Sequence, residues 1–239
     1  MTSHFTTAAD ALTQECRSLF GDTSHWITAD GYTNSLALAI IDCIYSTGSH
    51  YQSVVNVVNK YREYRHAQGA DADRDGTEEL LATFHEAGGS AQWAELVDNR
   101  KPAHTRPDAP LKAAVIQQAA TALHELGIRT RDDVHAAHAK DHWFSELKKT
   151  WLRLPSQSSG VTFNYFLILS GFQSVKPDRM VIRFVEEHAG LRGKDVTPMQ
   201  AAELIAQVAA QYPTEPRMLD HVIWRHVSGR DIFRSDELS

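Results

Sequence analysis

The sequence predicts an all-helical protein, and the spacing and content of its apolar residues carry this prediction. Apolar residues recur every three or four positions along almost the whole chain, as they do on one face of a helix. No stretch alternates strictly between apolar and polar residues for long enough to require a sheet. Hydrophobic residues form 42% of the 239 positions, so the chain can bury a core as one large domain or two small ones.

Caps and helix breakers divide this pattern into helices. Asp75 or Thr77 is expected to cap the helix that starts at 78, and Asp178 the helix that starts at 179. Three prolines between 99 and 110 predict an exposed connection. In chain order, the predicted helices cover 7–19, a segment after Gly31 that ends near 46, 51–65, 78–87, 91–96, 111–126, 131–139, 141–152, 161–169, 179–189, 198–211 and 216–228.

Composition excludes several classes of protein. The two cysteines, Cys16 and Cys43, are too few for an iron–sulfur cluster or a four-cysteine zinc site, so we expect both to be reduced and packed and no cofactor to be bound. No apolar run approaches the ~20 residues of a membrane span, and the first residues lack a basic region followed by an apolar one. We therefore expect a cytoplasmic protein with no membrane partner.

The charge is unevenly distributed. The chain carries −6 overall, which by itself argues against a nucleic-acid partner. Residues 140–194, however, hold nine basic and five acidic side chains, a local charge of +4. Such a chain can present a basic face to a polyanion and remain acidic elsewhere.

This basic region contains two landmarks. The predicted helices 141–152 and 161–169 are joined by the short link 154–160, and such a hairpin can point backbone N–H groups at a DNA phosphate. A break follows, and then Val175-Lys-Pro-Asp178-Arg179 places a carboxylate at a helix start between two basic residues. On local grounds alone, the link is more typical of an ordinary helical turn than of a DNA hairpin, and Asp178 is more typical of a cap that pairs with Arg179 than of a catalytic group.

Taken together, these features resemble the helix-hairpin-helix DNA glycosylase superfamily, and within it the endonuclease III-like proteins, over residues 30–230. Leu154-Pro155 and Val175-Lys-Pro-Asp178 are similar to that family's Leu-Pro-Gly-Val-Gly hairpin and to the segment bearing its catalytic Asp. Leu36–Tyr45 with the turn 46–50 resembles the helix and loop that insert a side chain into DNA. Residues 218–230 resemble the closing helix.

The resemblance implies a two-lobed helical fold of the DNA glycosylase type. One lobe would span 26–172 and end in the hairpin, and the other would combine 1–25 with 173–239 and carry the catalytic Asp178. DNA would be held by Thr47, Gly48, Ser49, Ser156, Gln157, Ser158, Gly160, Lys176 and Arg179. Stacking and edge hydrogen bonds hold a flipped base, so we expect its pocket at Tyr45, His50, Tyr51 and Asn164.

The implied activity is DNA N-glycosylase, in which a monomer acts on double-stranded DNA, flips out a damaged or modified base and excises it with the help of Asp178. Its role would be repair, or defence against phage with modified DNA. No Lys lies between Gln157 and Lys176, so we expect a monofunctional enzyme without imine-based lyase activity. Ser156 and Ser158 replace the hairpin glycines, and the cysteines of the family's iron–sulfur loop are absent.

Two alternatives remain at this stage, and a third signal, a partial calcium loop, is set aside. The same fold can serve as a catalytically inactive DNA-binding or protein-interaction module. His135, His138 and His142 share one helical face and suggest a metal-dependent hydrolase. Residues 71–76 copy the first half of a calcium loop, but Ala82 stands where the loop requires Glu, so an acidic capping loop is the better interpretation.

Overall fold

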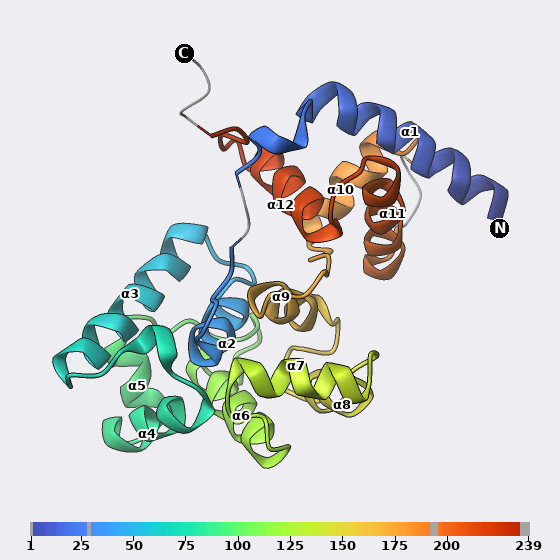
Figure 1. The fold of residues 1–239 in the computed structure, drawn as a ribbon. Coiled ribbons are helices and arrows are strands. Elements are labelled where there is room, and N and C mark those ends of the chain that lie inside the picture. The colour runs from blue at the N-terminus through green and yellow to red at the C-terminus, as the bar shows by residue number, and fades with distance from the viewer. Residues whose placement is uncertain (1, 28–29, 192–195, 235–239) are drawn as a thin grey trace. The chain divides into compact units, whose positions relative to one another are not determined.

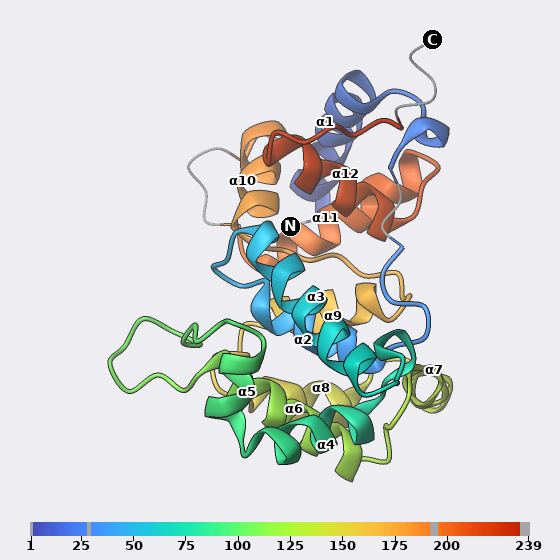
Figure 2. The same ribbon diagram turned by 90° about the vertical axis from the view of Figure 1, so that its left-hand side faces the viewer.

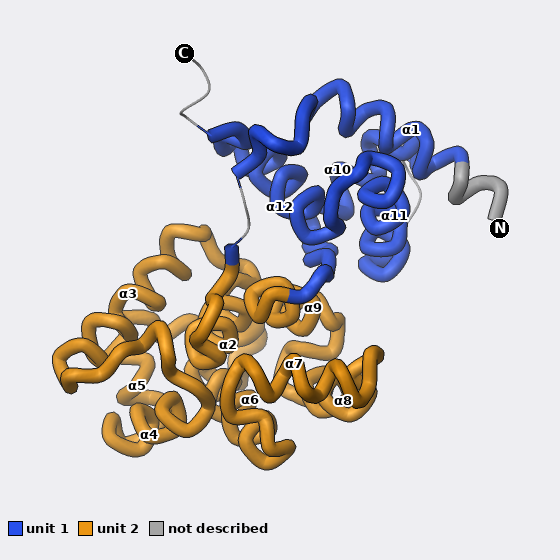
Figure 3. The backbone as a smooth tube through the Cα atoms, in the orientation of Figure 1, with its two compact units in different colours: residues 1–30, 172–239 blue, residues 31–171 orange. Residues whose placement is uncertain are grey.

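The computed structural model describes residues 2–27, 30–191 and 196–234. Throughout these ranges, the regular structure is helical, apart from two isolated bridges, Trp26 with Phe233 and Pro102 with Leu111. The all-helical class predicted from the sequence is therefore confirmed (Figure 1). The chain divides into two compact units, residues 31–171 and residues 1–30 with 172–239 (Figure 3). The boundaries predicted from the sequence are 25/26 and 172/173.

The unit formed by residues 31–171 is built around α2 (Leu36–Tyr45). All ten residues of α2 are buried, because α3, α4, α6 and α9 pack around it (Figure 1). Its N-terminus is capped by Ser35, whose Oγ accepts from Leu38 N at 3.2 Å. The surrounding elements are α3 (Tyr51–Ala67), η2 (Ala72–Arg74), α4 (Thr77–Ala87), α5 (Ser90–Leu96), α6 (Lys112–Glu125), α7 (Arg131–Lys140), α8 (Ser145–Leu152) and α9 (Val161–Leu169).

An ion pair joins α3 to the segment before α4. Arg65 donates from Nε to Asp75 Oδ2 at 2.7 Å and from Nη2 to Asp75 Oδ1 at 3.1 Å. The hydroxyl of Tyr61 donates to the same Oδ2 at 2.7 Å. The side chain of Asp75 is only 4% exposed, so this bidentate pair is almost fully desolvated and fixes the acidic loop to α3.

The proline-containing connection between α5 and α6 is a narrow loop. Ala103 N donates to Pro110 O at 2.8 Å, and Lys112 N to Lys101 O at 2.9 Å, so the two arms of the loop pair with each other. Figure 2 shows this green segment projecting from the helices of its unit. The prolines fit here because the loop interior requires few N–H donors.

The other unit combines the two ends of the chain. It contains α1 (Thr2–Phe20), η1 (Thr23–His25), α10 (Arg179–His188), α11 (Pro198–Gln211) and α12 (Pro216–Val227). Helix α1 packs on α10 and α11, and α12 packs on the same two helices. Phe20 stacks on Phe184 with ring centroids 5.9 Å apart, and Ile27 N donates to Ile232 O at 2.9 Å. The N-terminal segment thus completes a core made chiefly by C-terminal residues.

Two local predictions were wrong. The helix predicted over 141–152 begins only at Ser145, because Asp141 accepts from Trp143 N and Ser145 N and Phe144 adopts φ 52°. Neither Asp75 nor Thr77 caps α4. Gly76 is the N-cap, and Glu79 Oε2 accepts its N–H at 2.9 Å. Only glycine fits there, because a Cβ would lie 2.1 Å from Arg129 O.

Candidate functional site

Asp178 is held rigidly at the start of α10. Its backbone N–H donates to Lys176 O at 2.7 Å across Pro177, and the fixed φ of proline suits this tight turn. Its Oδ1 accepts from Met180 N at 2.9 Å and Val181 N at 3.1 Å, which confirms the predicted cap. Among the described residues, nothing hydrogen-bonds to Oδ2. One oxygen of a helix-capping carboxylate is therefore left for other contacts.

Basic residues flank this carboxylate, as the sequence suggested. Lys176 is half-buried and Arg179 is exposed. Among the described residues, Asp178 forms the cap but no ion pair with Arg179, so only the first half of the simple alternative, a cap paired with its neighbour, is observed. The positive end of the helix dipole also favours an anion at this position.

Asp220, on α12, is a second carboxyl group at the same place, and sequence reasoning missed it. It is 6% exposed, and the backbone N–H of Lys176 donates to it. Burial raises the pKa of Asp220 well above its usual range, against the lowering effect of the Lys176 N–H, and the charge of Asp178 raises this pKa further. The available signal was its position beside the apolar stripe of Leu219, Val222 and Ile223.

Two further polar groups of α12 are buried. Arg217 Nε and His221 Nε2 find no hydrogen-bond partner within the part of the chain that the structure describes. Burial, with smaller contributions from Arg225 and Arg217, lowers the pKa of His221 to about 4, and Asp30 opposes them. His221 is therefore neutral near pH 7.

The hairpin link lies between α8 and α9. Gly160 is the N-cap of α9 with φ 75°, and Ser156 adopts φ 65°, a conformation that glycine would adopt more easily. Ser156 and Ser158 are exposed, as a phosphate contact requires. Gln157 is not: it is 3% exposed, and its amide bonds to Pro155 O and Thr162 Oγ1. The predicted phosphate contact by the Gln157 side chain is thus wrong, because the hairpin itself uses that amide.

The turn after α2 is fastened by two lysines. Lys112 Nζ donates to the main-chain oxygens of Ile44 (3.0 Å), Tyr45 (3.0 Å) and Thr47 (2.5 Å). Lys101 Nζ donates to Gly48 O and, at 3.0 Å, to Ser49 Oγ. Of the residues predicted to contact DNA here, Gly48 is exposed, whereas Thr47 and Ser49 are half-buried.

The four residues predicted for a base pocket have different environments. Tyr45 is 1% exposed and its hydroxyl donates to Asn99 O at 3.0 Å, so it belongs to the core and lines no open surface. Tyr51 is 42% exposed, His50 is exposed at the N-cap of α3, and Asn164 is half-buried on α9.

Asp42 is a buried carboxyl group that the sequence did not single out, and it hydrogen-bonds to two tyrosines. Tyr32 donates to Asp42 Oδ2 at 2.9 Å, and Tyr165 also hydrogen-bonds to Asp42. Burial raises the pKa of both tyrosines, and the nearby Asp42 and Tyr51 raise that of Tyr165 further. Asp42 is 6% exposed, so this cluster is a buried polar centre of its unit.

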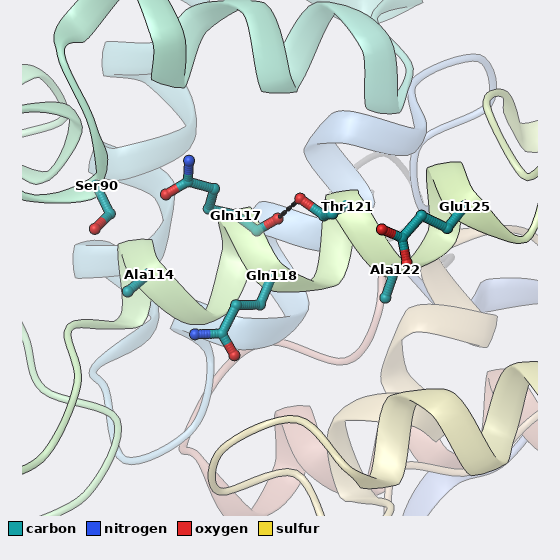
Figure 4. A pocket seen from close by; sticks show the side chains of 7 residues that line it. All are labelled: Ser90, Ala114, Gln117, Gln118, Thr121, Ala122 and Glu125. Atoms are coloured by element: carbon teal, nitrogen blue, oxygen red, sulfur yellow. Dashed lines mark hydrogen bonds between the residues drawn. The ribbon is translucent and has the colours of Figure 1, made fainter.

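The surface depression in Figure 4 is a poor base pocket. It holds about 430 Å³, within the range of small-molecule sites. Ser90 and one face of α6 line it, and Thr121 Oγ1 bonds back to Gln117 O at 2.9 Å. The lining has no aromatic or basic side chain and none of the residues predicted to bind DNA or base.

The residues of the two candidate metal sites make contacts within the protein. His135 Nε2 lies 3.0 Å from Ser170 O, and the His138 ring packs on His142 with centroids 4.8 Å apart. In the acidic loop, Asp73 pairs with Arg62 and Asp75 with Arg65. Nowhere in the described ranges do three His, Cys, Asp or Glu side chains converge as metal ligands.

None of the helices in the described ranges combines the length and the hydropathy that a membrane span needs. Comparison with curated proteins and with solved structures gives no match. Residues 10–228, which include most of both units, match a family model described as a domain of unknown function, DUF8548. The chain belongs to this DUF8548 family.

Proposed function

We propose that this protein is a monofunctional DNA N-glycosylase of the helix-hairpin-helix type, which excises a damaged or modified base. The observation that carries the proposal is the Asp178 carboxylate, fixed through Oδ1 at the start of α10 with Oδ2 left for a substrate. The order of hairpin, buried α9 and capped Asp178 along the chain supports it.

The chemistry uses a fixed negative charge. When the bond between C1′ and the base nitrogen breaks, positive charge develops on the sugar. The base leaves with the electron pair of the broken bond. Oδ2 of Asp178 stabilises the sugar charge or accepts a proton from the attacking water, whose oxygen becomes bonded to C1′, and this proton finally passes to the base or to solvent. A flexible carboxylate would have to reorganise during this step, whereas the two N–H bonds to Oδ1 hold Asp178 in place.

DNA is held in this proposal by the basic residues beside Asp178 and by the hairpin. Lys176 and Arg179 neutralise phosphates, and the exposed hairpin residues Ser156 and Ser158 contact the backbone. The lysine-fastened turn 46–50 fills the gap that the flipped nucleotide leaves. The segment between Gln157 and Lys176 offers no amine for an imine with the sugar, so the product is an abasic site in an intact strand.

The test is Asp178→Asn, assayed for abasic sites on duplexes that each carry one of a panel of modified bases. Asn caps helices as well as Asp, so the fold should persist. Single-turnover excision should fall by at least about 100-fold, while DNA affinity stays the same or rises as one negative charge is lost.

Asp141→Asn is the matched control. Asp141 also accepts two backbone N–H groups at a helix start, in the other unit, and the proposal gives it no chemical role. The catalytic role would be refuted if Asp178→Asn excised the base as fast as wild type and Asp141→Asn do.

A second candidate is a catalytically inactive DNA-binding module on the same scaffold. The buried Gln157 amide favours it, because the hairpin has one polar group fewer to offer than the sequence suggested. This module would bind duplexes in the same assay and yield no abasic site with any base of the panel.

A further inference from the structure

Two carboxyl groups of different character meet at the start of α10. Asp178 is half-buried and caps the helix, whereas Asp220 of α12 is buried beside it and within reach of its charge. We propose that they work as a pair in which Asp220 keeps a proton and Asp178 keeps the negative charge, and that Asp220 is thereby a positioning residue for Asp178.

Burial keeps the proton on Asp220. Its Oδ1 is buried and has no hydrogen-bond partner among the described residues. Its helix neighbours Leu219, Val222 and Ile223 are fully buried members of the apolar core. An ionised carboxylate would leave a charged oxygen unsolvated there, which costs far more than a neutral carboxyl group does.

The neighbouring charges are few and can be named. Asp178 and Lys176, both at the start of α10, act on Asp220, and within the described residues α11, the other helix packed on α12, contributes no charge to it. Lys176 favours an ionised Asp220, whereas Asp178 opposes it. A second negative charge beside the Asp178 carboxylate is disfavoured, so the proton stays on Asp220.

Asp220 also holds the turn that carries Asp178. It accepts the N–H of Lys176, whose carbonyl in turn accepts the N–H of Asp178 across Pro177. This contact does not require a charge on Asp220. The proton therefore lets Asp220 anchor the turn without placing a second anion next to Asp178. Its benefit to excision rests on the proposed function, whereas the location of the proton does not.

The experiment is a carboxyl-carbon NMR titration of the full chain, labelled with ¹³C at the aspartate side chains, from pH 4 to 10. One aspartate carboxyl should remain protonated at pH 7, and its signal should be absent from Asp220→Asn. In Asp178→Asn, the same signal should persist but titrate about 1 pH unit lower, because the opposing charge is gone. Asp141→Asn should leave it unchanged.

The proposal would be overturned if every aspartate were ionised by pH 7. It would also be overturned if the carboxyl signal that stays protonated at pH 7 were still present in Asp220→Asn, or if its titration did not move in Asp178→Asn. The Asp178→Asn titration tests the pair even if Asp220→Asn does not fold. Where wild type excises a base, its rate should decline in alkali as Asp220 ionises, and Asp220→Asn should lose this decline. An unchanged pH profile would overturn the positioning role, whereas absence of excision by wild type would overturn only the glycosylase proposal.

Discussion

The ammonium group of Lys112 lies 2.5 Å from the main-chain oxygen of Thr47. Lys112 is 2% exposed and belongs to the first turn of α6, whereas Thr47 follows the last turn of α2. A helix C-terminus leaves carbonyl oxygens without partners and carries partial negative charge, so one buried cation satisfies both needs. The turn that would contact DNA in the proposed glycosylase is therefore held in place by a residue of another helix.

Lys112→Met should remove the three charged bonds to Ile44 O, Tyr45 O and Thr47 O, and, among the described residues, leave only the hydroxyl donors Thr47 and Ser49 on the first and third of these oxygens. We expect the free energy of unfolding to fall by about 3 kcal/mol, measured by urea denaturation, and by more than in Lys101→Met. Lys101→Met is the control, because Lys101 is less buried and contacts only the outer part of the turn. Equal stability of Lys112→Met and wild type would contradict the capping role.

Asp75→Ala should be strongly destabilising, because it leaves the guanidinium of Arg65, whose side chain is 12% exposed, without its carboxylate. The expected loss is about 3–5 kcal/mol in thermal or urea unfolding. Asp73→Ala breaks the exposed pair with Arg62 and should cost about 1 kcal/mol or less. Equal losses of unfolding free energy in the two variants would contradict the argument that burial makes the Arg65–Asp75 pair important for stability.

Ser156→Gly should stabilise the protein slightly. A non-glycine residue at φ 65° is strained, and glycine relieves this strain while adding freedom to the unfolded chain, so the net gain should be about 0.5–1 kcal/mol. Ser158 is not among the residues with positive φ, so Ser158→Gly should destabilise instead. Denaturation curves of the two variants check the prediction: the change in unfolding free energy should have opposite signs. A loss of stability in both variants would refute it.

His221 should make the protein sensitive to acid. Burial lowers its pKa from 6.5 to about 4 in the folded state, so between these values the unfolded chain binds a proton that the folded chain does not. Neutral His221 therefore contributes to the free energy of unfolding above pH 6.5, and this contribution is lost as the pH falls toward 4. The loss is less than about 3 kcal/mol, because the ring is partly exposed. His221→Gln should flatten the fall of unfolding free energy over this window, and a variant of the exposed His66 should not. An unchanged curve for His221→Gln would contradict the burial argument.

Much of the local structure could be predicted from short stretches of sequence. Helix α9 was predicted with its observed ends, 161–169, because Gly160 and the break after Leu169 flank a continuous apolar run. The Asp178 cap was predicted because a cap depends only on a side chain and the next three N–H groups. The late start of α8 could not be predicted, since Asp141 satisfies the N–H groups of Trp143 and Ser145 in a turn that competes with another helical turn.

The sequence by itself determined where the helices form and which carboxylate caps α10, because periodicity and capping act within about four residues of the chain. Only the tertiary structure decided which polar groups lose their water. Asp220, Asp42, Gln157 and Lys112 look like ordinary surface residues in the sequence, yet each is buried by segments distant in the chain or within its own hairpin. Desolvation depends on everything packed around a group, and it sets the charge state and the partners that a buried side chain can have.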